Sequence, residues 1–168
     1  MEICDDTNSL LAGSAIGSDE NCNGLEGMDD HYCVKQSGLS FHDSLTRADY
    51  YSPASDAHLD TATAIISVVP PDIDPPVQVA LSNLIPRDAA CAAITSVNLT
   101  ADITEPVGTS IAFEASNDGG TTWEPITRGA VHNFGSAGSG LKWKASLTSN
   151  GVSTSPTIHS IDLTWTCG

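Results

Sequence analysis

The chain has few aromatic residues and few basic ones. Aromatics make up 5% of its 168 residues, so the core must be small and aliphatic. Lys and Arg number 6 against 21 Asp and Glu, which gives a formal net charge of −15. A chain without clustered cations does not bind phosphates well, and anionic membrane surfaces repel an acidic protein. We therefore expect neither nucleic acid nor membrane as a partner.

Long apolar runs are also missing. No stretch approaches the roughly 18 apolar residues of a transmembrane helix. The start of the chain, Met-Glu-Ile-Cys-Asp-Asp, lacks the basic and apolar regions of a signal peptide, which predicts a soluble protein that is released into the cytosol where it is made. The chain contains no G-x-S-x-G, no H-E-x-x-H and no phosphate-binding glycine loop. We therefore expect no enzymatic activity and no catalytic residues.

Acidic residues concentrate in the first half of the chain. Residues 1–74 hold 14 acids and 2 bases, whereas residues 75–168 hold 7 acids and 4 bases. Residues 70–76 read Pro-Pro-Asp-Ile-Asp-Pro-Pro, which favours an extended conformation. We predict an acidic N-terminal arm over 1–69, a proline-rich linker over 70–76 and a β-sandwich domain over 77–168.

Apolar and polar residues alternate through the C-terminal part. Residues 97–103 read Val-Asn-Leu-Thr-Ala-Asp-Ile, and this period of two indicates a strand with one solvated face. Turn residues separate similar segments, which is typical of an all-β fold with an antiparallel β-sandwich or jelly roll. The further predicted strands are 64–69, 77–81, 111–115, 122–127, 130–134, 141–147 and 161–165.

Residues 1–60 have a different composition. They are rich in Asp, Ser, Gly and Asn, with scattered apolar residues. Such a segment can hardly close a core by itself, so we expect an extended, mostly irregular arm that gains order on a partner. Residues 39–51 are the only modest candidate for a helix.

One segment of the arm fits a calcium-loop pattern. Residues 19–30 match D-x-[DN]-x-[DN]-G-x5-[DE], in which oxygens at alternate positions converge on a hard cation and Gly24 allows a sharp turn. The loop differs from the EF-hand pattern at Glu26, at its shorter last acid and in its poor helix-forming flanks. The alternative is a solvated acidic loop. The candidate calcium ligands are Asp19, Asn21, Asn23, Asp30 and the carbonyl of Leu25.

Residues 116–123 read Ser-Asn-Asp-Gly-Gly-Thr-Thr-Trp. This segment resembles the Asp-box pattern S-x-D-x-G-x-T-W of sialidase-type β proteins, where the motif is a structural hairpin and not a catalytic site. Asp118 can accept hydrogen bonds from the turn backbone, and glycines supply positive φ. We predict a structural hairpin formed by Ser116, Asp118, Gly120 and Trp123. A single copy cannot build a propeller, so sialidase activity does not follow.

The cysteines are odd in number, so at least one thiol lacks a partner within the chain. Cys91 and Cys167 bracket the predicted β domain and are a plausible disulfide, and Cys22 with Cys33 could close a small loop in the arm. Either bond would need an oxidising environment. A zinc site is the alternative in the arm, although no C-x2-C pair supports it. Its ligands would be Cys22, His31, Cys33 and His42.

The tryptophans allow two interpretations. Trp123, Trp143 and Trp165 fall on the apolar phase of predicted strands, which favours core packing. The alternative is a sugar-stacking platform on one face of a sheet.

Residues 95–165 combine these strands, the Asp-box turn and the closing segment Ile-Asp-Leu-Thr-Trp. The stretch resembles small β-sandwich modules of tailed-bacteriophage structural proteins, among them tail fibres and capsid decoration (cement) proteins. The resemblance implies a non-enzymatic virion protein that binds other capsid or tail proteins, with its arm lying over them. Symmetric contacts favour a homo-oligomer, with a trimer preferred. The alternative function is a carbohydrate-binding or adhesive module, in one version calcium-dependent.

Overall fold

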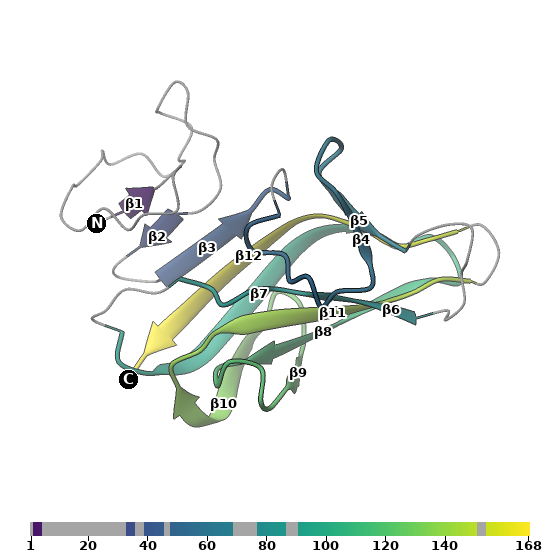
Figure 1. Cartoon of the computed structure of the whole chain (residues 1–168). Coiled ribbons are helices and arrows are strands. Elements are labelled where there is room, and N and C mark those ends of the chain that lie inside the picture. Colours follow the sequence, from purple (N-terminus) through teal and green to yellow (C-terminus); the bar gives the residue numbers. More distant parts are fainter. Residues whose placement is uncertain are drawn as a thin grey trace.

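In the computed structural model of the protein, the described part of the chain is all-β. This part contains two antiparallel sheets of the sandwich and one further strand pair, but no helix (Figure 1). The predicted fold class is therefore confirmed. The structure describes residues 2–4, 33–35, 39–45, 48–68, 77–86, 91–150 and 154–168, with residues 2–4, 33–35 and 39 as backbone only.

The larger sheet has six strands. Their order is β10-β7-β12-β5-β4, and β3 pairs with β12 beside β5. β7 follows one edge of the long strand β12, whereas the other edge is divided between β5 near Ile158 and β3 from Ile161 to Trp165 (Figure 1). The members are β3 (Leu39–Asp43), β4 (His58–Asp60), β5 (Ile65–Ser67), β7 (Ile94–Thr104), β10 (Val131–Gly138) and β12 (Thr157–Cys167).

The smaller sheet has four strands in the order β6-β11-β8-β9. Most of them coincide with segments in which the sequence alternates. A separate two-stranded pair is formed by β1 (Glu2–Cys4) and β2 (Cys33–Lys35). The four members are β6 (Val77–Leu81), β8 (Ser110–Ser116), β9 (Glu124–Ile126) and β11 (Lys142–Thr148).

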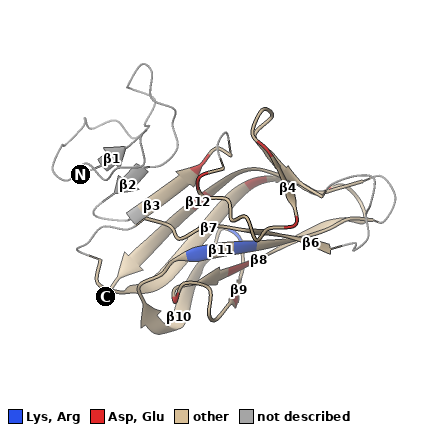
Figure 2. Cartoon of the chain, viewed as in Figure 1, with Lys and Arg blue, Asp and Glu red and all other residues tan. Residues whose placement is uncertain are grey.

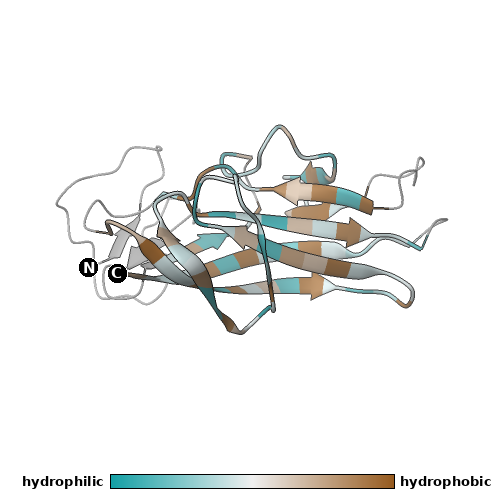
Figure 3. Cartoon of the chain, turned by 90° about the horizontal axis from the view of Figure 1, so that it is seen from below, coloured by the Kyte–Doolittle hydropathy of each residue, from teal (hydrophilic) through white to brown (hydrophobic). Residues whose placement is uncertain are grey.

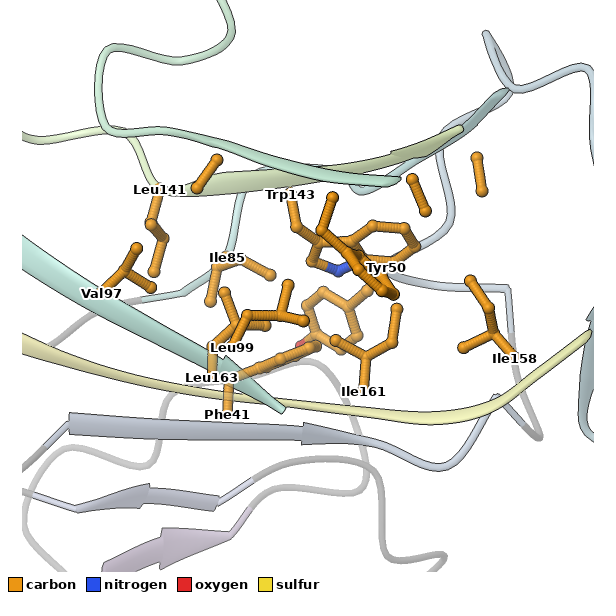
Figure 4. Close-up of a cluster of buried hydrophobic side chains, with 14 of the residues drawn as sticks. Phe41, Tyr50, Ile85, Val97, Leu99, Leu141, Trp143, Ile158, Ile161 and Leu163 are labelled. Atoms are coloured by element: carbon orange, nitrogen blue, oxygen red, sulfur yellow. The ribbon is translucent and has the colours of Figure 1, made fainter. Parts of the chain in front are cut away.

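The core lies between the inner faces of the two sheets. β11 contributes Trp143, and Leu99 of β7 and Leu163 of β12 lie across from it, all essentially inaccessible to solvent (Figure 4). Figure 3 shows the alternation of apolar and polar residues along the strands. Each fully buried aliphatic side chain stabilises the fold by roughly 1.5–3 kcal/mol, so this layer is the main source of stability.

Part of the predicted arm belongs to the sandwich. Residues 39–68 supply β3, β4 and β5, and Phe41 and Ile66 are 1% and 0% exposed in the shared core. The division into an arm over 1–69 and a sandwich from 77 therefore differs from the structure. The helix candidate at residues 39–51 begins with a strand, because β12 offers it an edge. Residues 70–76 lie outside the described residues.

A disulfide closes one end of the sandwich. Cys91 and Cys167 are bonded, with their Cα atoms 5.4 Å apart, as the sequence predicts. Cys91 precedes β7 and Cys167 ends β12, and these two strands are neighbours in the sheet. The bond therefore joins the two central strands of the six-stranded sheet at the end where β12 stops.

Candidate functional site

The Asp-box turn folds as a compact hydrogen-bonded unit. The Ser116 hydroxyl donates to Asp118 Oδ1 over 2.7 Å and accepts the backbone N–H of Gly120 at 2.9 Å. Asp118 Oδ1 also accepts the backbone N–H groups of Thr121 and Thr122 at 3.0 and 2.9 Å. Gly120 has φ of 95°, a conformation that residues with a Cβ rarely adopt. The predicted structural role of this turn agrees with these contacts.

The Asp118 carboxylate is held in its ionised form. The hydrogen bond from the backbone N–H of Thr122, followed by that from the Ser116 hydroxyl, lowers the pKa of Asp118 to about 2. Both donors stabilise the charged carboxylate. An acid fixed in this way is a poor proton donor at neutral pH, so the turn is suited to structure rather than to acid catalysis.

Asn117 joins this turn to the other sheet. It is 6% exposed, and its Nδ2 donates to the carbonyls of Ile94 at 3.0 Å and Ser136 at 2.7 Å. These two carbonyls lie on β7 and β10, where the pairing of the two strands shifts register between Asn133 and Gly138. The Asn117 amide therefore fills the bulge between them. Sequence reasoning missed this role, because the motif pattern leaves that position open.

Gly138 makes the close approach of β10 to the turn possible. A Cβ at Gly138 would lie 2.2 Å from the backbone oxygen of Asn117. We expect Gly138→Ala to lower the free energy of unfolding by about 1–3 kcal/mol, measured by urea denaturation, because the backbone must shift to relieve the overlap. Gly135→Ala is the matched control, because its Cβ would meet nothing within 4 Å. Equal stability of the two variants would contradict the packing argument.

Trp123 lies on the outer surface of the four-stranded sheet and not in the core. Its side chain is half-buried, and the Lys144 ammonium sits 4.8 Å from the ring centroid. Lys144 also pairs with Glu114 at 2.5 Å. The core interpretation was therefore wrong for Trp123, whereas it is confirmed for Trp143 and Trp165, which are 0% and 2% exposed. The phase failed for Trp123 because it precedes β9, where the turn reorients the chain.

Basic side chains of the described residues gather near this tryptophan. Figure 2 shows the two lysines of β11 as blue segments of the ribbon. A Cβ at Gly120 would lie 3.3 Å from Trp123 and 3.5 Å from the Lys142 side chain, so these groups are neighbours. Trp123, Glu114 and the two lysines make up what we call the Trp123 cluster. Its aromatic ring and charges could contact a polar ligand or another protein.

Two histidines form ion pairs between strands. His42 Nδ1 of β3 lies 2.6 Å from Asp162 Oδ1 of β12, on the solvent side of the six-stranded sheet. His132 Nε2 of β10 lies 2.9 Å from Glu124 Oε2 of β9, which connects the two sheets. Each pair joins neighbouring chain segments across a sheet or between sheets, and we assign both a structural role.

The predicted metal sites fall mostly outside the described residues. Those positions are Asp19, Asn21, Asn23, Leu25 and Asp30 of the calcium loop, and Cys22 and His31 of the zinc alternative. Cys33 is described by its backbone in β2, and His42 pairs with Asp162. Within the described ranges, no group of three or more His, Cys, Asp or Glu side chains is placed to hold a metal ion.

The chain was compared with protein-family models and with curated protein sequences. No protein-family model matches the chain, and no curated protein matches its sequence. In the described part of the structure, no helix has the length and apolar character needed to cross a membrane.

Proposed function

We propose that this chain is a non-enzymatic structural protein of a tailed-bacteriophage virion, of the capsid decoration (cement) or tail-fibre type. In this proposal the sandwich is displayed on the particle, and the acidic N-terminal segment binds other capsid or tail proteins. The protein is made in the host cytoplasm and acts in the virion as a homo-oligomer, with a trimer favoured. Calcium in the loop at residues 19–30 would strengthen the attachment.

The observation that carries the proposal is the way β3 is built into the sandwich. Residues 1–38 contain eight acids and one base, and they lead directly into β3. β3 pairs with β12, and Phe41 inserts into the common core. A force on the N-terminal segment is therefore transmitted to the core through β3 and not to a loose linker. This suits a segment that connects a displayed domain to a particle.

The disulfide is a second support. A bond between Cys91 and Cys167 persists in oxidising surroundings and is uncommon in a reducing cytosol. A virion protein meets oxidising surroundings once the particles have left the host. The bond would then form or persist on the particle, where it would stiffen the displayed domain.

Immunogold labelling of purified phage particles tests the proposal. Antibodies raised against the purified chain should label particles of the phage that carries the gene. Labelled heads would indicate a decoration protein, and labelled tails a fibre component. Release of the label by a chelator would assign calcium to the attachment. Unlabelled particles, with the chain found only in the soluble fraction of infected cells, would contradict the proposal.

One observation favours the second candidate, a carbohydrate-binding or adhesive module. Trp123 lies on an outer sheet surface beside Lys142, as a sugar-stacking residue would. Lys144 covers one side of the ring, however, which leaves less of it for stacking. Glycan binding by the wild-type chain that is lost in a folded Trp123→Ala variant would favour this function over the structural one.

A further inference from the structure

β10 is an edge strand among the strands that the structure describes. It lies at the end of the six-stranded sheet, and β7 is its only pairing partner among the described strands. It is 8 residues long and contains neither proline nor a charged residue other than the ion-paired His132. Val131 at its start is 66% exposed. An edge strand of this length and composition is an available template for another strand.

The edges formed by β9, β6 and β4 are protected against pairing. β9 has Pro125 at its centre, which cannot donate a backbone hydrogen bond. β6 is covered by the segment before β4, whose Ser52 and Ala57 N–H groups donate to carbonyls of β6. β4 is only 3 residues long and ends in Asp60. Each is a common device against edge pairing, and the sequence of β10 has none of the charged or proline residues that provide such protection.

The charge of the chain restricts what can approach this edge. At a net charge of −15, two copies repel each other over most of their surface. Residues 129–141 carry no acidic or basic side chain apart from His132. Arg128 lies shortly before the first residue of β10. Asp118 lies near the other end of the strand, because it forms a β-bridge with Gly140, which follows the last residue of β10 closely. Antiparallel pairing of two β10 strands therefore brings the Arg128 end of one copy toward the Asp118 end of the other.

The bulge in β10 is held in place before any partner arrives. The Asn117 amide binds the Ser136 carbonyl at 2.7 Å, and Glu124 Oε1 accepts the Gly135 N–H at 3.4 Å. Residues 134–137 are thus withdrawn from β7, and two of their backbone groups are held by these hydrogen bonds. A preorganised edge loses little conformational entropy when a strand adds to it.

We propose that β10 is a self-association edge, at which two copies of this chain pair their β10 strands antiparallel about a two-fold axis. The two six-stranded sheets then form one continuous sheet, with main-chain hydrogen bonds providing the contact. β10 itself carries no acidic side chain, and the Glu124 carboxylate beside it is already bonded to His132 and Gly135. With Arg128 before one end and Asp118 near the other, this edge fits a second copy, which brings the opposite charge to each end. The contact goes beyond the proposed virion function and does not depend on it.

The test compares two glutamate substitutions in the full chain. Val131→Glu places a like charge near the partner's Asp118 end, whereas Val107→Glu changes the net charge equally at a turn valine that is 97% exposed. Sedimentation across a concentration series in the presence of a chelator should show dimerisation of the wild type. Val131→Glu should raise the dissociation constant by at least about tenfold, and Val107→Glu should raise it much less.

Hydrogen exchange locates the contact. The β10 amides should gain protection as the wild-type concentration rises, and Val131→Glu should remove that gain. Asn133→Glu, at another exposed position of β10, should repeat the effect if Val131→Glu folds poorly. A wild type that stays monomeric up to its solubility limit, or an association that both glutamate positions in β10 leave unchanged relative to Val107→Glu, would overturn the proposal.

Discussion

Replacing both Cys91 and Cys167 by serine is expected to lower the free energy of unfolding by about 4 kcal/mol. The bond closes a loop with a sequence separation of 76 residues, which includes almost the whole C-terminal part of the sandwich. In the chain-entropy model, a loop of this length restricts the unfolded chain strongly, and the loss of the bond releases that restriction. Both strands that the disulfide joins are central, so the folded state loses little else.

Urea denaturation of the wild type and the double variant, without reductant, measures the difference. Reductant should destabilise the wild type by a similar amount. In the double variant it can act only through Cys4, Cys22 and Cys33. A double variant as stable as the oxidised wild type would mean that the unfolded chain is already compact around these strands.

Asp43→Asn is expected to stabilise the protein at neutral pH. Asp43 ends β3 and is 5% exposed, and its Oδ1 accepts the Leu45 N–H at 2.9 Å. Burial raises the pKa of Asp43 to about 6 from its ordinary 3.8, although the Leu45 hydrogen bond and His42 oppose the change. Asparagine keeps an oxygen for the Leu45 N–H and carries no charge. The shift corresponds to a gain on the order of 3 kcal/mol above pH 6.

The pH dependence follows from the direction of this pKa shift. Below the unfolded pKa of 3.8, Asp43 is neutral in both states and the two proteins should be equally stable. Between there and about pH 6 the folded state retains a proton that the unfolded state releases, so wild-type stability falls as pH rises. Above the pKa of Asp43 in the folded state, the wild type has lost the full amount of this stability. The advantage of Asp43→Asn should therefore appear between about pH 4 and 6.

Thermal or urea unfolding at pH 3.5, 5 and 7 checks this expectation. Asp102→Asn, at an exposed position of β7, changes the net charge equally and serves as the control. A constant difference between Asp43→Asn and wild type at all three pH values would contradict the assignment. It would then have to come from packing or from the Leu45 turn, where φ is 59°.

The strands of the C-terminal part could be predicted because each one is half-buried. Val77–Leu81 coincides with β6, and the alternation at 141–147 and 161–165 falls within or one residue from β11 and β12. A period of two requires only that one face of a strand meets the core, and this is a local property of the sequence. The Asp-box turn was predictable for a similar reason, since the side-chain hydrogen bonds of Ser116 and Asp118 lie within seven residues.

β3 could not be predicted in the same way. It is only five residues long, and its partner β12 is far along the chain, so that His42 meets Asp162 across a separation of 120 residues. Its place depends on the edge that β12 leaves open beside β5. The outer position of Trp123 and the Asn117 amide in the β10 bulge likewise depend on where another strand runs.

The sequence alone determined the all-β class, most strand phases and the Asp-box turn, and it offered Cys91 with Cys167 as a plausible disulfide. The first three could be predicted because burial on one face and turn chemistry leave local patterns. Only the tertiary structure decided that residues 39–68 contribute strands to the sandwich, that Trp123 lies outside the core and that β10 is an edge strand among the described strands. These depend on which strands become neighbours, and neighbourhood in a sheet is set by long-range pairing and packing that no local pattern records.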